Sequence, residues 1–105
     1  MQVQVNTDHN IQGDERLAEV AESIVADGLG GLAGRLTRVE VHLRDENAGK
    51  GGGDDIRCAL EARPEGLRPF GVSHSGEDVE AALRGAVRKL KTRLEHEFGK
   101  LSARE

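Results

Sequence analysis

The clearest pattern of hydrophobic and polar positions runs through the last third of the chain. Apolar residues recur there at steps of three and four, which places them on one stripe of a helix with about 3.6 residues per turn. They are Val79, Ala82, Leu83, Ala86, Val87, Leu90, Leu94, Phe98 and Leu101. Ser75, Gly76 and Asp78 precede this run and supply N-cap chemistry. We therefore predict a helix that begins near Val79 and reaches Leu101.

A second helix is predicted in the first third of the chain. Asp14 is a favourable N-cap residue, and the apolar positions after it again lie three or four residues apart. These positions are Leu17, Val20, Ala21, Ile24 and Val25. Glycines at positions 28, 30 and 31 predict a C-cap followed by a flexible link. The solvent side of this helix is expected to carry Glu15, Glu19 and Glu22.

Four further segments are predicted as strands, and the first three alternate between polar and apolar residues, which is typical of half-buried strands. They span residues 2–6, 35–45, 56–63 and 67–74. In the second segment, the residues expected on the buried face are Thr37, Val39, Val41 and Leu43. Pro69 has no backbone N–H to donate, so the last strand is expected at a sheet edge or at a bulge. Residues 47–55 contain four glycines and predict a loop.

Together these elements follow the order β-α-β-β-β-α. We expect an α+β fold in a single domain over residues 1–105, with a four-stranded, mainly antiparallel sheet and two helices packed on one face. No apolar run approaches the roughly 20 residues of a membrane span, and no secretory leader is visible. The single Cys58 fits a reducing compartment, so a cytoplasmic location is expected.

Charge is distributed unevenly along the chain, although the formal net charge is only −4. Residues 1–36 contain six acids and two bases, whereas residues 79–94 contain five bases and one acid. These five bases, the candidate nucleic-acid-binding residues, are Arg84, Arg88, Lys89, Lys91 and Arg93. Such residues can contact phosphates, but the chain has no Trp or Tyr on which bases could stack. The alternative is an ordinary solvated helix face with ion pairs such as Lys91–Glu95.

The sequence shows no pattern typical of an enzyme or of a metal site. His42, Cys58 and His74 fall on different predicted strands, and His42 is out of phase with the apolar face on which Cys58 is expected. No Cys/His pair has the spacing of zinc ligands, and neither glycine-rich segment matches a phosphate-binding loop. No carboxylate lies in an apolar run that would raise its pKa toward catalytic use. We therefore expect no catalytic residue, no metal ligand and no cofactor.

The last helix also carries a recognisable order of residue types. It opens with an acidic pair, passes through alanine and leucine, and reaches a Lys-Leu step before a further leucine. The residues concerned are Glu77, Asp78, Ala81, Leu83, Lys89, Leu90 and Leu94. With residues 1–5, Asp14, Leu17 and the strand 39–43, this order resembles the ribosome hibernation-promoting factor family, also called ribosome-associated inhibitors or ribosomal subunit interface proteins. The likeness covers the short form of the family.

This resemblance implies that the protein binds the small ribosomal subunit near the decoding and messenger channel. Such binding would inhibit translation in stressed or stationary cells, with ribosomal RNA backbone as the partner surface. Lys89 stands at the family's basic position in the last helix, and Thr92 stands where a further base is common, with Arg93 beside it. Glu80 replaces a frequent aromatic residue.

The first helix departs from the family pattern. Relatives often carry Lys or Arg on its exposed face, whereas this chain carries Glu15, Glu19 and Glu22, which oppose phosphate contact. Three interpretations stay open. The protein is a ribosome-binding factor that uses mainly its last helix, assisted by Arg38 or Arg44 of the sheet, or it is a protein-interaction module that docks through its acidic helix. The third and least favoured interpretation is a minor enzyme or metal-binding subunit. The exposed edge expected near Pro69 leaves a weak homodimer open.

Overall fold

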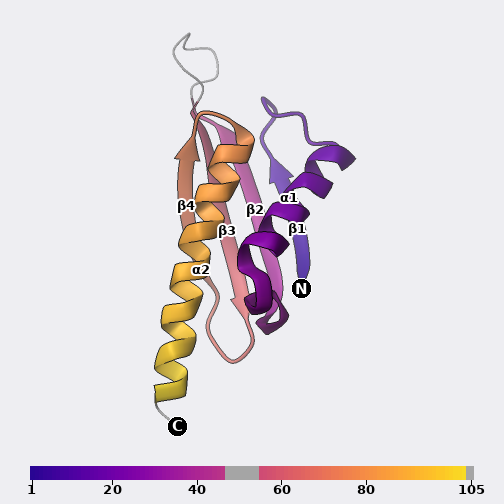
Figure 1. The fold of residues 1–105 in the computed structure, drawn as a ribbon. Coiled ribbons are helices and arrows are strands. Elements are labelled where there is room, and N and C mark those ends of the chain that lie inside the picture. The colour runs from indigo at the N-terminus through magenta and orange to yellow at the C-terminus, as the bar shows by residue number, and fades with distance from the viewer. Residues whose placement is uncertain (47–54, 104–105) are drawn as a thin grey trace.

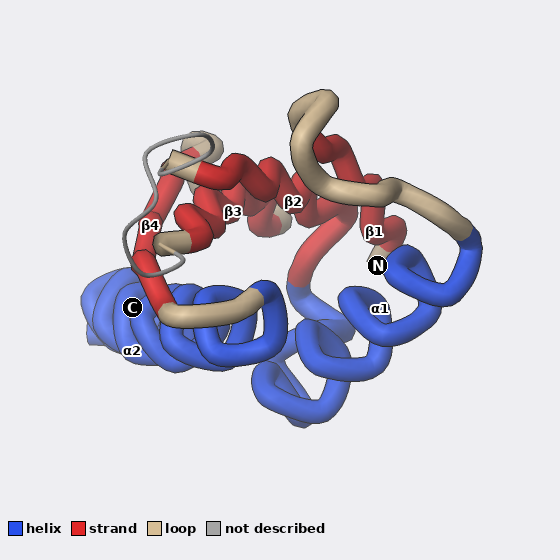
Figure 2. Tube along the Cα trace, turned by 90° about the horizontal axis from the view of Figure 1, so that it is seen from above, coloured by secondary structure: helices blue, strands red, loops and turns tan. Residues whose placement is uncertain are grey.

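The computed structural model describes residues 1–46 and 55–103, and the elements follow the predicted order. The strands are β1 (Gln2–Thr7), β2 (Leu36–Asp45), β3 (Ile56–Pro64) and β4 (Phe70–Gly76). The helices are α1 (Glu15–Leu29), the short 3-10 helix η1 (Gly30–Arg35) and α2 (Val79–Ala103). Both long helices lie on the same face of the sheet, which confirms the predicted α+β architecture (Figures 1 and 2). No helix in the described ranges is long and apolar enough to cross a membrane.

The sheet is mixed and keeps its strands in sequence order, β1-β2-β3-β4. β1 runs parallel to β2 because α1 carries the chain back across one face between them, whereas β2, β3 and β4 pair antiparallel. β1 and β4 are therefore the two edge strands. Among the described residues, no helix lies on the other face of the sheet, and we call it the open face (Figure 2).

The core lies between the sheet and the two helices. Alternation along the central strands buries Val39, Val41 and Leu43 from β2, and it buries Cys58 and Leu60 from β3. The predicted stripe of α2 covers them, and its fully described buried members are Ala82, Leu83, Ala86, Val87, Leu90, Leu94 and Phe98. Val79 is only partly buried, and the side chain of Leu101 lies outside the described residues.

Both predicted helix starts are confirmed by side-chain caps. The Oδ1 atom of Asp14 accepts a hydrogen bond from the backbone N–H of Leu17 at 2.9 Å. The Oδ1 atom of Asp78 accepts from the N–H of Ala81 at 2.7 Å. Each cap satisfies a backbone donor that has no partner within its helix. α1 ends at Leu29, and its C-cap residue Gly30 has a φ of 57°, which glycine adopts at little cost.

Three sequence-based expectations were wrong in detail. The expected flexible link after α1 is the ordered helix η1. In β2, a register shift between Leu36 and Arg38 buries Leu36 and turns Thr37 to solvent, where the Thr37 hydroxyl donates to a β3 carbonyl. β4 begins at Phe70 rather than Leu67, because Pro69 cannot donate to the ladder. The loop expected over residues 47–55 falls mostly outside the described residues.

Candidate nucleic-acid interface

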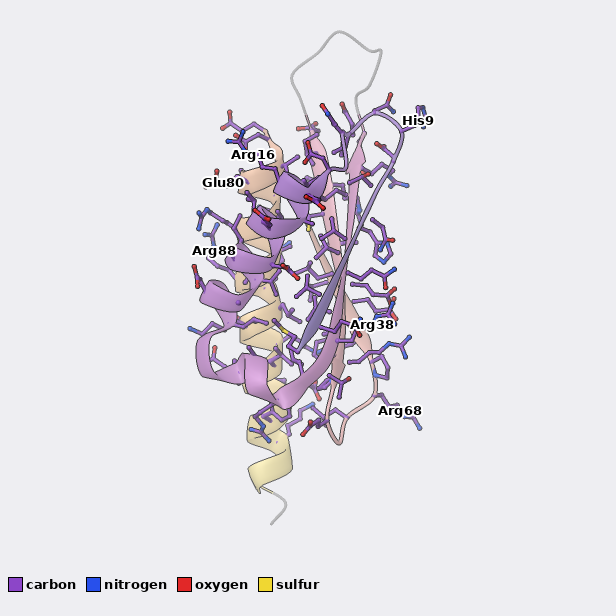
Figure 3. All side chains as sticks on the ribbon, turned by 90° about the vertical axis from the view of Figure 1, so that its right-hand side faces the viewer. His9, Arg16, Arg38, Arg68, Glu80 and Arg88 are labelled. Atoms are coloured by element: carbon purple, nitrogen blue, oxygen red, sulfur yellow. The ribbon has the colours of Figure 1, made fainter. Side chains whose placement is uncertain are left out.

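The five candidate cations of α2 are all exposed on the helix layer. Figure 3 shows Arg88 on this side of the molecule, whereas Arg38 and Arg68 lie on the side of the open face. The apolar stripe of α2 is buried against the sheet, so the remaining arc of the helix points to solvent. The five cations thus lie along the exposed arc of a single helix. Arg84 and Arg88 are on the flank beside α1, whereas Lys89 and Arg93 reach toward β4.

Two of the five cations are neutralised by acids on the same helix. The Arg84 guanidinium lies 2.9 Å from the Glu80 carboxylate, four residues earlier. The Arg93 Nε atom donates to the Glu97 carboxylate at 3.2 Å, four residues later. Exposed pairs of this kind contribute only about 0.3–0.5 kcal/mol, so a phosphate could displace either acid. Each displacement nevertheless lowers the gain from a new contact.

The other three cations keep their charge available. Within the described ranges, neither Arg88 nor Lys91 forms an ion pair, and the pair expected between Lys91 and Glu95 is not made. Lys89 donates from Nζ to the backbone carbonyl of Ser73 at 2.9 Å, a neutral acceptor that leaves the ammonium charge uncompensated. Arg88, Lys89 and Lys91 therefore form the un-neutralised part of the α2 surface.

The arginines of the open face are in a different electrostatic state. The guanidinium groups of the four arginines on β2 and β3 each lie within 4 Å of a carboxylate, in the pairs Arg38–Glu40, Arg44–Glu46, Arg57–Glu46 and Arg63–Glu61. Arg68, in the turn before β4, forms no ion pair within the described ranges. From the sequence, Arg38 or Arg44 is predicted to assist the last helix in binding RNA. Because both already face carboxylates, the open face offers a polyanion less net positive charge than α2 does.

Neither phenylalanine provides a stacking platform. The Arg35 guanidinium lies 3.6 Å from the centroid of the Phe98 ring, and the Arg93 guanidinium lies 4.6 Å from that of Phe70. Each ring is therefore covered by a cation on one face. Any nucleic acid on this surface would be held by its backbone and shape rather than by stacked bases.

The acidic helix lies directly beside the basic one. α1 and α2 run side by side on the same face of the sheet, as the views in Figures 1 and 2 agree. Glu15, Glu19 and Glu22 are exposed, and none of them forms an ion pair within the part of the chain that the structure describes. Arg84 and Arg88 line a hollow of about 220 Å³ between the helices, together with Asp27 of α1. The helix layer is thus acidic on one side and basic on the other.

His42 and Cys58 lie as their phase along the strands predicts. Cys58 is fully buried on the helix side of β3, and burial raises the pKa of its thiol to about 12. His42 is exposed and pairs with Ala59, one residue out of phase with Cys58, so it lies on the open face. His74 is opposite Cys58 in the sheet. His42 and Cys58 therefore cannot share a ligand.

Two features of the surface were missed from the sequence. The acids that neutralise Arg84 and Arg93 stand four residues from them, a spacing that could have identified the pairs. A group of Glu40, His42 and Glu61 on the open face depends instead on the register of β2 against β3. No spacing rule along the chain reveals that register.

Comparisons with known proteins agree with this architecture. A ribosomal subunit interface protein from Coxiella burnetii superposes with a TM-score of 0.77 at 11% identity, covering 94% of this chain and 99% of that one. The N-terminal domain of Protein Y from Thermus thermophilus gives a TM-score of 0.72 at 19% identity, covering 91% and 98%. No curated protein gives a significant match. The family model described as sigma 54 modulation protein / S30EA ribosomal protein matches residues 4–102, so the chain belongs to that family, as the resemblance of its last helix indicated.

Proposed function

We propose that this protein binds the small ribosomal subunit near the decoding and messenger channel and inhibits translation during stress or stationary phase. The family membership supports this proposal, as does the shared fold with a protein named for the ribosomal subunit interface. The mechanism is occupancy: a folded cytoplasmic domain fills the space through which messenger and transfer RNA must pass. No catalytic step and no cofactor are required.

The observation that carries this proposal is the un-neutralised charge of Arg88, Lys89 and Lys91. Phosphate contacts by such residues release counterions and supply most of the sequence-independent affinity for RNA. Because the cations lie on one helix, they can follow a single RNA backbone. Arg84 and Arg93 extend the same surface, and each exchanges a carboxylate partner for a phosphate on binding.

Co-sedimentation of the purified protein with small subunits and with whole ribosomes tests the proposal. We expect comigration at low salt that weakens steeply as salt rises. The double variant Arg88→Glu/Lys89→Glu should abolish comigration and leave the far-UV circular dichroism unchanged, because both side chains are exposed.

A matched control is Arg57→Glu/Arg68→Glu, which makes the same change in net charge at two other exposed positions. Arg68 lies on the side of the open face in Figure 3. Comigration that survives in this control and is lost in the α2 double variant supports contact through α2. Equal loss of comigration in both variants would mean that net charge alone accounts for the effect. Unchanged comigration of the α2 double variant would refute the proposal.

A second candidate is a protein-interaction module that docks through α1. The observation that favours it is the exposed row of Glu15, Glu19 and Glu22, acids without an ion pair in the described part of the chain. A basic protein would be the partner. Failure to comigrate with ribosomes even at low salt would favour this candidate over the first.

A further inference from the structure

Three side chains with metal-binding atoms meet on the open face of the sheet. They are Glu40 and His42 of β2 and Glu61 of β3. One carboxylate oxygen from each glutamate and one imidazole nitrogen all lie within 4.8 Å of one another. The group is on the face opposite the two helices, and it plays no part in the proposed contact with RNA.

The register of the two central strands explains this meeting. Glu40 is directly opposite Glu61 in the antiparallel pair, and His42 stands two residues further along the same face. The partner of His42 is Ala59, whose methyl group leaves the imidazole room to turn toward the carboxylates. Like charges directly opposite each other destabilise a sheet unless a counter-charge lies between or beside them.

Two arginines already supply part of that counter-charge. Arg38 lies 3.3 Å from Glu40, and Arg63 lies 3.9 Å from Glu61. The shortest contact in each of these ion pairs is made to the Oε1 atom of the glutamate. Neighbouring groups that hold one oxygen of a carboxylate also fix its orientation, as outer partners do around bound metals.

We propose that Glu40, His42 and Glu61 bind a divalent first-row transition metal of the Zn²⁺ class. One imidazole and two carboxylates form a ligand set that such ions accept, with water in the remaining position. Bonds of about 2.0–2.2 Å in a tetrahedral site place ligand atoms about 3.4 Å apart. The three side chains must therefore approach one another by up to about 1.4 Å, which rotamer adjustments on exposed side chains can supply.

The site is accessible from solvent. His42 and Glu61 also line a hollow of about 610 Å³ on the open face, whose other walls include Gly71 and Ser73 of β4. A metal held there keeps an open coordination position toward this hollow. Spacings along the chain give no sign of this ligand set, because the group is assembled across two strands.

A calorimetric titration of the full chain with Zn²⁺ tests the proposal. Absorption spectra of the Co²⁺-bound protein report the ligand types. We expect one ion per chain. His42→Ala and Glu61→Gln should each weaken binding at least tenfold, while His96→Ala, which removes an exposed histidine of α2, should leave it unchanged. Circular dichroism of each variant shows whether the fold is intact, and Glu61→Gln decides the result if His42→Ala does not fold.

Absence of binding at millimolar Zn²⁺ would overturn the proposal. Binding that persists in both His42→Ala and Glu61→Gln would also overturn it, as would a cobalt–thiolate charge-transfer band, which would assign the ion to Cys58. Ribosome comigration is measured separately on the same variants and should not change, because α2 lies on the other side of the sheet. Failure of the metal proposal is therefore distinguishable from failure of the proposed function.

Discussion

Gly28 of α1 lies against Val87 of α2 with no room for a side chain. A Cβ atom added to Gly28 would lie 2.3 Å from the Val87 Cγ1 atom, well inside van der Waals contact. The Val87 side chain is buried. This close approach holds the two helices together, and it keeps the acidic row of α1 beside the basic arc of α2.

Replacing Gly28 by alanine should therefore destabilise the protein. The substitution gains up to about 1 kcal/mol in helix propensity, but overpacking against Val87 costs about 1–3 kcal/mol. We expect a net loss of up to about 2 kcal/mol in the free energy of unfolding, measured by urea denaturation. Gly99→Ala is the control, because Gly99 lies in α2 with nothing within 4 Å of an added Cβ.

Gly99→Ala should stabilise the protein by about 0.5–1 kcal/mol, since it removes backbone entropy from the unfolded chain without a clash. Equal effects of the two substitutions would contradict the role assigned to the Gly28–Val87 contact.

The fold could be predicted from the sequence wherever periodicity and capping agreed. Asp14 and Asp78 marked both helix starts, and alternation in β3 identified its buried residues correctly. The prediction failed where pairing between strands decides the outcome. Thr37 belonged to a regular alternation, and the register shift beside it turned its side chain to solvent. The polar and apolar pattern within one strand does not determine its register against the next strand.

The candidate site was predicted only in part, for a related reason. The sequence identified the basic side of α2, but it could not rank the five cations by the acids near them. The structure separates Arg84, which faces Glu80, from Arg88, which forms no ion pair in the described ranges. Lys89 contacts Ser73 of a neighbouring strand, a contact that no pattern along α2 predicts.

The buried thiol predicts how stability depends on pH. Burial raises the pKa of Cys58 from 9.0 to about 12, so the folded state holds this proton more tightly than the unfolded state. The contribution of this protonated thiol to the free energy of unfolding is fully present below pH 9 and is lost as pH rises toward about 12. At pH 10 the unfolded thiol is mostly ionised, which costs about 1.4 kcal/mol of stability.

Cys58→Ala serves as the reference for this titration. We expect the free energy of unfolding of the original chain to fall by about 1.4 kcal/mol more than that of Cys58→Ala between pH 7 and pH 10. Both proteins share the other groups that titrate in this range, so the difference reports Cys58. Parallel curves for the two proteins would show that the thiol is not protected by burial.

The ion pairs on α2 predict unequal contributions to ribosome binding. If α2 contacts RNA phosphates, Arg88→Gln should reduce the slope of log K against log salt concentration by about 0.7–0.9. Arg84→Gln should reduce the affinity less, because this guanidinium must first leave Glu80. Glu80→Gln should strengthen binding, since it frees Arg84. Equal losses for Arg84→Gln and Arg88→Gln would mean that the intrahelical pair does not compete with RNA.

The acidic row of α1 gives the test that best separates the two candidate functions. Glu19 is exposed and forms no ion pair in the described part of the chain, and its helix lies beside α2. If RNA covers the helix layer, Glu19 repels its phosphates, and Glu19→Lys should tighten ribosome binding in a salt-dependent manner. Glu65→Lys makes the same charge change in the turn between β3 and β4 and should have a smaller effect. If α1 instead docks a basic protein, Glu19→Lys should weaken that association while Glu65→Lys leaves it intact, because only the former places like charges against the partner.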